Sequence, residues 1–180
     1  MRSTRLSILE QVMKNPHASA SSFAQLLTIS ALLLGVGTSQ RALANEQQDE
    51  PQSVQESGDR IIGRWLTQPK DAVVEITREG DKYVGNIVWL KEPNDDDGSP
   101  VVDAENPDRR LQDRPVLGLR ILRDFQFDGN RWVDGRIYDP ASGNDYRCRM
   151  SLEDDGTLRV RGFVGIAAFG RTEVWTRQDG

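Results

Sequence analysis

The residue types that most often carry catalysis are scarce in this chain of 180 residues. It has one histidine, His17, and one cysteine, Cys148. His17 lies in a segment that we expect to be removed, which excludes Ser-His-Asp and Cys-His nucleophiles and histidine-based zinc or iron sites. A single cysteine forms neither an internal disulfide nor a thiolate cluster.

Carboxylates could instead support acid–base chemistry. Asp103 lies in a long loop together with Asn106, and Asp139 opens the turn that ends at Gly143. A hydrolase built on two carboxylates needs them about 5–10 Å apart in a cleft. The alternative is structural: Asp139 caps its own turn, and Asn106 caps a short helix. We favour the structural alternative and expect a protein that is not an enzyme.

The acidic segment 94–98 does not match a calcium-binding loop. If Gly98 takes the glycine position of an EF-hand, Pro93 and Ala104 stand at the first and last ligand positions, where carboxylates are required. A solvated loop is the simpler interpretation. We expect no metal and no cofactor.

Arginines alternate along two neighbouring predicted strands. The turn that ends at Gly156 fits a three-residue hairpin loop, and this register places Arg149 directly opposite Arg161. Arg147 and Arg159 extend the same face. Like charges directly across a strand pair destabilise a sheet, so this arginine stripe calls for an explanation.

Two explanations of the arginine stripe are open. It binds a carboxylate, a phosphate or an acidic partner, because guanidinium groups pair well with such anions. Alternatively it is an outer face neutralised by Glu173 or Glu75 from neighbouring strands, or by water.

The first 44 residues have the order of a secretory signal. Basic residues precede an apolar run of 14 residues at 23–36, and an Ala-Leu-Ala cleavage pattern ends at Ala44. The run is shorter than the about 20 residues of a membrane span. We expect cleavage and a periplasmic or secreted protein that does not span a membrane, with a retained N-terminal anchor as the alternative.

Removal of residues 1–44 takes away four basic side chains and one acidic side chain, so the net charge changes from −5 to −8. An acidic protein without a basic tail is a poor match for nucleic acid. Residues 45–58 are polar and acidic, which is typical of a disordered linker. The domain at 59–180 is long enough for one core and too short for two.

Inside the domain, short apolar runs separated by turn signals predict eight strands and no helix of ten residues or more. The strands are expected at 61–67, 72–79, 82–90, 117–127, 131–139, 145–152, 157–164 and 170–177. The first hairpin is expected to pair Val74 with Ile87 and Ala72 with Trp89. The fold class is therefore all-β, and short turns in succession favour a single small antiparallel, up-and-down barrel over a sandwich.

One connection, at 91–116, is long and contains four prolines. Long loops in compact domains are often functional. Asn106-Pro107 is typical of a helix start, so we expect a short helix at 107–112 lying across one end of the barrel.

Aromatic side chains could line a cavity inside such a barrel. The candidates are Trp65, Tyr83, Trp89, Phe125, Tyr138 and Tyr146. A barrel of about eight strands either holds one small ligand or is filled by its own side chains, and both alternatives remain open. Cys148 is expected on the apolar face as an inert buried thiol.

Several motifs resemble known families. Gly63-Arg64-Trp65 with Arg177 resembles the lipocalin and calycin signature, in which an arginine packs beside a first-strand tryptophan at the closed end of the barrel. The wider pattern resembles the bacterial domain-of-unknown-function family 2147 (DUF2147) over about 61–177. It comprises Gly63-Arg-Trp-Leu, Ala72-Val-Val-Glu-Ile76, Gly85-Asn-Ile-Val-Trp-Leu-Lys91, Asp103-Ala-Glu-Asn-Pro-Asp108, Gly135-Arg-Ile-Tyr-Asp-Pro-Ala-Ser-Gly143, Leu158-Arg-Val-Arg-Gly-Phe-Val-Gly165 and Phe169-Gly-Arg-Thr-Glu-Val-Trp-Thr-Arg177.

The resemblance implies a small lipocalin-like barrel, export from a Gram-negative bacterium, and no assigned activity. We expect non-enzymatic binding of a small or amphipathic molecule at the barrel mouth beneath the long loop. The alternative is a cell-envelope interaction or inhibitor module that uses the outer surface. The candidate contacts are Trp65, Tyr83, Trp89, Asp103, Asn106, Tyr138, Asp139, Arg149 and Arg161.

Overall fold

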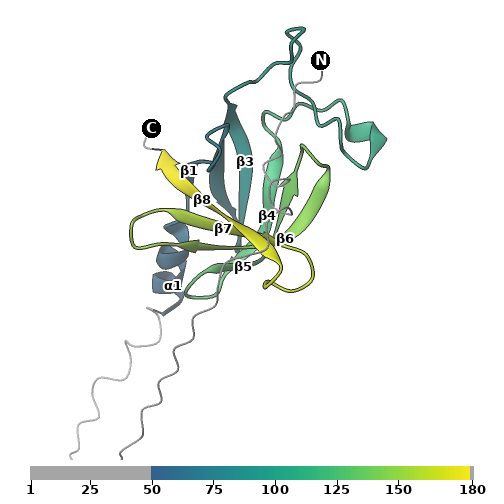
Figure 1. The fold of residues 1–180 in the computed structure, drawn as a ribbon. Coiled ribbons are helices and arrows are strands. Elements are labelled where there is room, and N and C mark those ends of the chain that lie inside the picture. The colour runs from purple at the N-terminus through teal and green to yellow at the C-terminus, as the bar shows by residue number, and fades with distance from the viewer. Residues whose placement is uncertain (1–49, 179–180) are drawn as a thin grey trace, which may run out of the picture.

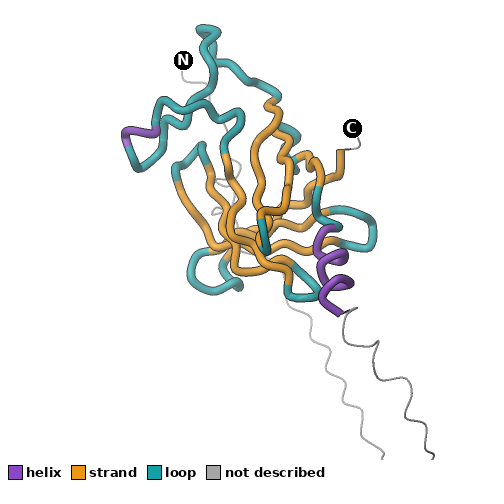
Figure 2. The backbone as a smooth tube through the Cα atoms, turned by 180° about the vertical axis from the view of Figure 1, so that it is seen from behind, coloured by secondary structure: helices purple, strands orange, loops and turns teal. Residues whose placement is uncertain are grey.

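The computed structural model describes residues 50–178, and these form one closed antiparallel barrel (Figures 1 and 2). Each strand pairs with the next along the chain, and β8 returns to pair with β1. The elements are α1 Glu50–Asp59, β1 Gly63–Leu66, β2 Ala72–Glu79, β3 Lys82–Leu90, the 3₁₀ turn η2 Arg109–Leu111, β4 Arg120–Phe127, β5 Trp132–Asp139, β6 Asn144–Leu152, β7 Leu158–Phe163 and β8 Gly170–Gln178. The predicted eight-stranded, up-and-down barrel is confirmed.

The hairpin between β6 and β7 has the predicted register. Arg149 lies opposite Arg161, and Leu152 lies opposite Leu158. Gly156 has a φ of 80°, the left-handed conformation that closes a three-residue loop. Alternate residues of both strands therefore face the core, as the apolar alternation indicated.

The hairpin between β2 and β3 departs from its predicted register at one point. Val74 pairs with Ile87 as expected, but the pairing shifts beyond it, so that Val73 lies opposite Trp89 and Ala72 opposite Leu90. The shift is a bulge, in which Val88 is the extra residue. The predicted pairing of Ala72 with Trp89 is wrong, because one inserted residue turns Trp89 to the other face of the sheet.

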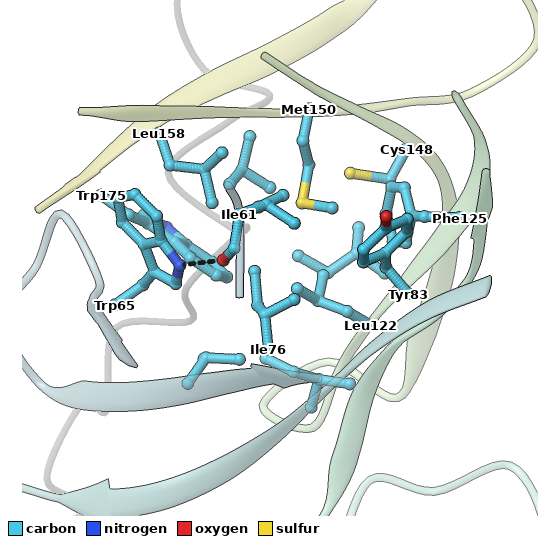
Figure 3. Packing of buried hydrophobic residues seen from close by; sticks show 14 of the residues in the cluster. Ile61, Trp65, Ile76, Tyr83, Leu122, Phe125, Cys148, Met150, Leu158 and Trp175 are labelled. Atoms are coloured by element: carbon cyan, nitrogen blue, oxygen red, sulfur yellow. Dashed lines mark hydrogen bonds between the residues drawn. The ribbon is translucent and has the colours of Figure 1, made fainter. Parts of the chain in front are cut away.

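The barrel interior is occupied by large apolar side chains (Figure 3). Those with no more than 2% of their surface exposed include Trp65, Phe125, Trp132, Met150 and Trp175. Cys148 is 1% exposed, and burial raises the pKa of its thiol well above the ordinary range. It is an inert core residue, as predicted.

Helix α1 closes one end of the barrel, hereafter the helix end (Figure 1). Tyr83 donates a hydrogen bond from its hydroxyl to Asp59 Oδ1 at 2.9 Å, and Trp132 Nε1 donates to the carbonyl oxygen of Gly58 at 3.2 Å. These partners sit on β3 and β5. They attach the end of the helix to the barrel wall.

The structure therefore differs from the disordered linker expected at 45–58. Residues 50–58 belong to α1, and residues 45–49 lie outside the described residues, as does the predicted signal segment 1–44. Composition predicted disorder because the segment has few apolar groups of its own. Composition does not show the role of Gly58, which lacks a side chain and so allows the helix to approach Tyr83 and Phe127.

Trp65 and Arg177 complete the helix end. The Arg177 guanidinium lies 4.3 Å from the centre of the Trp65 ring and donates to the carbonyl oxygens of Ile62 and Arg60. Trp65 Nε1 donates to the carbonyl oxygen of Ile61 at 2.8 Å. The opposite end, hereafter the loop end, carries the connections 67–71, 91–119, 139–143 and 164–169.

Candidate functional site

Strand β8 places two charged side chains on the inner face of the barrel. Trp175 is fully buried in the core, and the two-residue period of a strand puts Glu173 and Arg171 on the same face. The register agrees, because Glu173 lies opposite the buried Val160 of β7. Both charges therefore lie inside the wall toward the loop end.

Glu173 is 3% exposed and only half satisfied. Its Oε2 accepts a hydrogen bond from Trp175 Nε1 at 2.9 Å. Within the described residues, Oε1 has no hydrogen-bond partner, and neither does the buried Nη1 of Arg171. The inner wall thus presents one unpaired acceptor and one unpaired donor.

Burial raises the pKa of Glu173, because an ionised carboxylate loses its hydration inside the barrel. The Trp175 hydrogen bond and the charge of Arg171 oppose this effect, whereas the charges of Asp71 and Asp139 add to it. The inner wall at this end thus brings together charged groups from β8 and from two connections.

Asp139 holds the turn between β5 and β6. Its Oδ1 accepts from the backbone N–H of Ala141 at 3.2 Å, and its Oδ2 accepts from the Ser142 hydroxyl at 2.6 Å. This is the turn-capping role that the structural interpretation predicted. Gly143 has a φ of 68°, and any Cβ there would collide with the backbone of Glu105. The long loop therefore packs directly against this turn.

Asp103 anchors the long loop to the outside of β5. It is fully buried, and its Oδ1 accepts a 2.7 Å hydrogen bond from the Tyr138 hydroxyl. Its Oδ2 accepts from Asn106 Nδ2 at 2.8 Å and pairs with Arg114 Nη2 at 2.7 Å. Burial and the bond to Asp103 raise the pKa of Tyr138 to about 12, so its hydroxyl stays a donor.

Asp103 and Asp139 do not form the acid–base pair that a hydrolase would need. Tyr138 and Asp139 are neighbours on β5, and neighbouring side chains on a strand point to opposite faces. Tyr138 reaches out to Asp103, whereas Asp139 is on the inner side, where its charge acts on Glu173. The strand separates the two carboxylates.

Asn106 does not cap the short helix as expected. Asp108 is the N-cap of η2, where it accepts from the backbone N–H of Arg110, and the helical turn covers only Arg109–Leu111 of the predicted 107–112. Asn106 instead bonds Asp103 and the Tyr138 hydroxyl. Its side-chain amide donates hydrogen bonds to these two buried oxygens. A helix cap at the protein surface would not make such bonds.

The aromatic candidates do not line a common site. Trp65 and Tyr83 lie at the helix end, and Tyr138 lies outside β5 beneath the long loop. Trp89 is 45% exposed, because the β3 bulge turns it away from the interior. Phe125 is a fully buried core residue, and Tyr146 packs against the core.

Arg149 and Arg161 lie on the outer face, where the sequence placed them. They line a hollow of about 350 Å³ together with Arg131 and Arg159. Glu173 does not neutralise this face. The prediction that it could is wrong, because its spacing from Trp175 sets it on the inner side.

Arg171 and Glu173 were missed as site residues. The signal was present in Arg171-Thr-Glu-Val-Trp175, where every second residue shares the face of a core tryptophan. Within residues 50–178, no group of three or more His, Cys, Asp or Glu side chains is arranged to hold a metal ion. None of the helices in that range combines the length and the apolar character needed to cross a bilayer.

Comparison with known proteins agrees with this architecture. The sequence model of a bacterial family described as "Uncharacterized protein conserved in bacteria (DUF2147)" matches residues 63–177. The chain belongs to the DUF2147 family. The match begins at the first strand and ends at Arg177, so the DUF2147 region coincides with the barrel.

A solved structure supports the fold of this DUF2147 member. Protein HP1028 from Helicobacter pylori, described as belonging to the lipocalin family, superposes with a TM-score of 0.58 at 23% identity. The similarity covers 66% of this chain and 83% of HP1028. The barrel is therefore lipocalin-like. No curated protein matches the chain.

Proposed function

We propose that this DUF2147 member is a binding protein that takes up a small or amphipathic molecule through the loop end of its barrel. The observation that carries the proposal is the inner-face pair Arg171 and Glu173, each with a buried atom that lacks a hydrogen-bond partner among the described residues. An unpaired buried polar group costs about 1–3 kcal/mol. A ligand that pairs with both groups would recover this cost.

The pair also indicates what the ligand presents. Arg171 Nη1 is a donor and favours an acceptor or an anionic group, whereas Glu173 Oε1 favours a hydroxyl, an amine or another donor. The surrounding inner wall is apolar. A molecule with a small polar head and an apolar body suits this combination, and the lipocalin-like fold supports the proposal.

In this proposal the chain carries its ligand and does not transform it. Asp103 and Asp139 are held in structural hydrogen bonds on opposite sides of β5, which leaves a carboxylate hydrolase without its pair. We therefore include a non-enzymatic role in the proposal.

The test is native mass spectrometry of the protein purified without denaturation, compared with its Glu173→Gln and Arg171→Gln variants. We expect a reproducible extra mass on the wild type that unfolding removes and that both variants lose. Glu75→Gln, on the outer face, is the matched control and should keep the mass. A bare polypeptide, still bare after incubation with cell-envelope extract, would argue against a carrier.

We also propose that the protein is exported and acts in the periplasm or outside the cell. The basic, apolar and Ala-Leu-Ala segments of residues 1–44 support this. Fractionation of the native bacterium, with the mass of the purified chain, tests it. A soluble periplasmic or secreted chain that starts near Asn45 is expected, and a full-length cytoplasmic chain would contradict the proposal.

A further inference from the structure

The outer face of β6, β7 and β8 carries a hollow of about 350 Å³ beside the turn between β4 and β5, hereafter the arginine hollow. Its lining residues are Asn130, Arg131, Arg149, Met150, Ser151, Arg159, Arg161 and Thr172. Four of these are arginines and none is acidic. Its volume falls within the about 300–1,000 Å³ typical of small-molecule sites. It lies on the other side of the wall from Glu173, so it is independent of the proposed interior site.

Two of the four charges are compensated. Arg159 Nε lies 3.5 Å from Glu153 Oε1, and Arg131 Nε lies 3.5 Å from Asp128 Oδ2. In the described part of the chain, no carboxylate lies within ion-pair distance of Arg149 or of Arg161. These two residues are directly opposed on β6 and β7. The sheet therefore holds two like charges side by side, which is unfavourable without an anion.

The carboxylates that could have neutralised this pair have other partners. Glu75 Oε1 pairs with Arg64 Nε at 3.1 Å, and Glu173 points into the barrel and bonds Trp175. Neither Glu75 nor Glu173 therefore neutralises Arg149 and Arg161 from a neighbouring strand. Water or an external anion is then left to balance these charges, and the hollow beside them has room for an anion.

Arg161 is held in place by neutral groups. Its Nε and Nη2 donate to the carbonyl oxygen of Ala167 at 2.9 and 2.6 Å, and its Nη1 donates to the Thr172 hydroxyl at 2.9 Å. These bonds orient the guanidinium and leave its charge unbalanced. Across the strand pair, Arg149 keeps its guanidinium available for a bidentate contact.

We propose that the arginine hollow binds a phosphate-type oxyanion, with Arg149 as its principal contact and Arg161 as a fixed positive charge. A phosphate group carries up to two negative charges near neutral pH and accepts bidentate hydrogen bonds from guanidinium. It therefore matches the two unpaired charges, whereas a single carboxylate neutralises one. The remaining volume accommodates the organic part of a phosphate monoester, either a soluble phosphorylated molecule or the head of a lipid such as phosphatidic acid.

The test titrates inorganic phosphate into the purified full-length protein and follows the arginine Nε–H signals by NMR. We expect the Arg149 and Arg161 signals to shift together, with an affinity that falls as salt is added. Arg149→Gln should weaken binding by about tenfold or more. Arg147→Gln is the matched control, because Arg147 lies two residues away on the same outer face of β6 but does not line the hollow. The affinity of the Arg147→Gln variant for phosphate should stay within about twofold of wild type.

Vesicles distinguish the two sources of phosphate. Co-sedimentation with phosphatidic acid but not phosphatidylcholine vesicles, lost in Arg149→Gln, would support a lipid headgroup. Binding of phosphate without vesicle capture would support a soluble phosphorylated molecule. Equal loss in Arg147→Gln and Arg149→Gln, no shift of either arginine with phosphate, or equal affinity for acetate and phosphate would overturn the proposal. Circular dichroism of each variant serves as the control for folding.

Discussion

Glu173 is an ionisable side chain buried on the inner face of the barrel. It is 3% exposed and has one hydrogen bond, from Trp175. Since burial raises its pKa, the folded chain holds the Glu173 proton more tightly than the unfolded chain does. The free energy of unfolding gained from this group is greatest at low pH and is lost as the pH rises through the raised pKa.

Replacement of Glu173 by Gln should therefore stabilise the protein in a pH-dependent way. A neutral amide avoids burial of a charge, so we expect the variant to exceed wild type by about 1–2 kcal/mol at neutral pH. The difference should shrink toward zero as the pH falls well below about 4, where the wild-type carboxyl is protonated in both states. Urea unfolding at several pH values measures it. A difference that does not change with pH, or that matches the exposed control Glu75→Gln, would refute this account.

Asp103 has the opposite character, because its buried charge is fully paired. Tyr138, Asn106 and Arg114 all donate to it. We expect Asp103→Ala to lower the free energy of unfolding by about 3 kcal/mol, since it leaves buried donors without an acceptor. Asp97→Ala, an exposed substitution in the same loop, should change it by less than about 0.5 kcal/mol. Chemical denaturation of both variants is the measurement, and similar losses would show that the Asp103 network is not what holds the loop.

The sequence indicated which residue types could bind a ligand better than it indicated where their side chains lie in the barrel. Arg149 and Arg161 were found from a hairpin register that depends on only three turn residues. Glu173 was assigned to the wrong face, because the assignment came from its charge and ignored its two-residue spacing from Trp175. The roles of Asn106 and Tyr138 depend on contacts 32 residues apart in the chain, which no local pattern contains.

At the scale of elements, the end of α1 depends on one position without a side chain. Gly58 lies against the Tyr83 hydroxyl and the Phe127 side chain, where a Cβ would collide. This close approach allows Asp59 to reach Tyr83, and burial together with that bond raises the pKa of Tyr83 to about 12. The composition of residues 50–58 does not show this contact, because the side chains that Gly58 approaches belong to β3 and β4.

Gly58→Ala should separate α1 from the barrel. We expect a loss of about 1–3 kcal/mol, the usual cost of inserting a methyl group into a filled space. Ser57→Ala, one residue earlier on the exposed side, should be neutral or slightly stabilising because alanine favours helices. Thermal unfolding compares the two. Faster amide hydrogen exchange in α1 of Gly58→Ala alone would locate the effect, and equal stability of both variants would contradict it.

Bulges limit what can be read about the elements from the sequence. Strand positions were predictable within one to three residues, because alternation and glycine turns are local signals. The extra residue at Val88 was not, because nothing in the residue types distinguishes a bulge from regular pairing there. It moved Trp89 from a presumed cavity wall to the exterior.

At the scale of the whole molecule, all eight strands share one core. Three of the four tryptophans are buried within it: Trp65 and Trp175 toward one side, and Trp132 near Phe127. The fourth, Trp89, is 45% exposed. Tryptophan emission therefore reports mainly on the barrel interior.

We predict that unfolding is a single cooperative transition. A closed sheet around one core has no part that keeps its packing when the rest is lost. The denaturant midpoints from tryptophan fluorescence and from far-ultraviolet circular dichroism should coincide. Trp89→Phe should keep most of the fluorescence change, because its indole is partly in water in both states. Two separated midpoints would reveal an independently unfolding part.

The barrel closes by pairing its first and last strands, as Arg64 with Gln178 shows. A ribosome makes β1 first and β8 last, so the growing sheet has two open edges until its final strand is complete. Open edges pair with other chains. We therefore expect a stop codon before β8 to produce an aggregating sheet and not a shortened barrel.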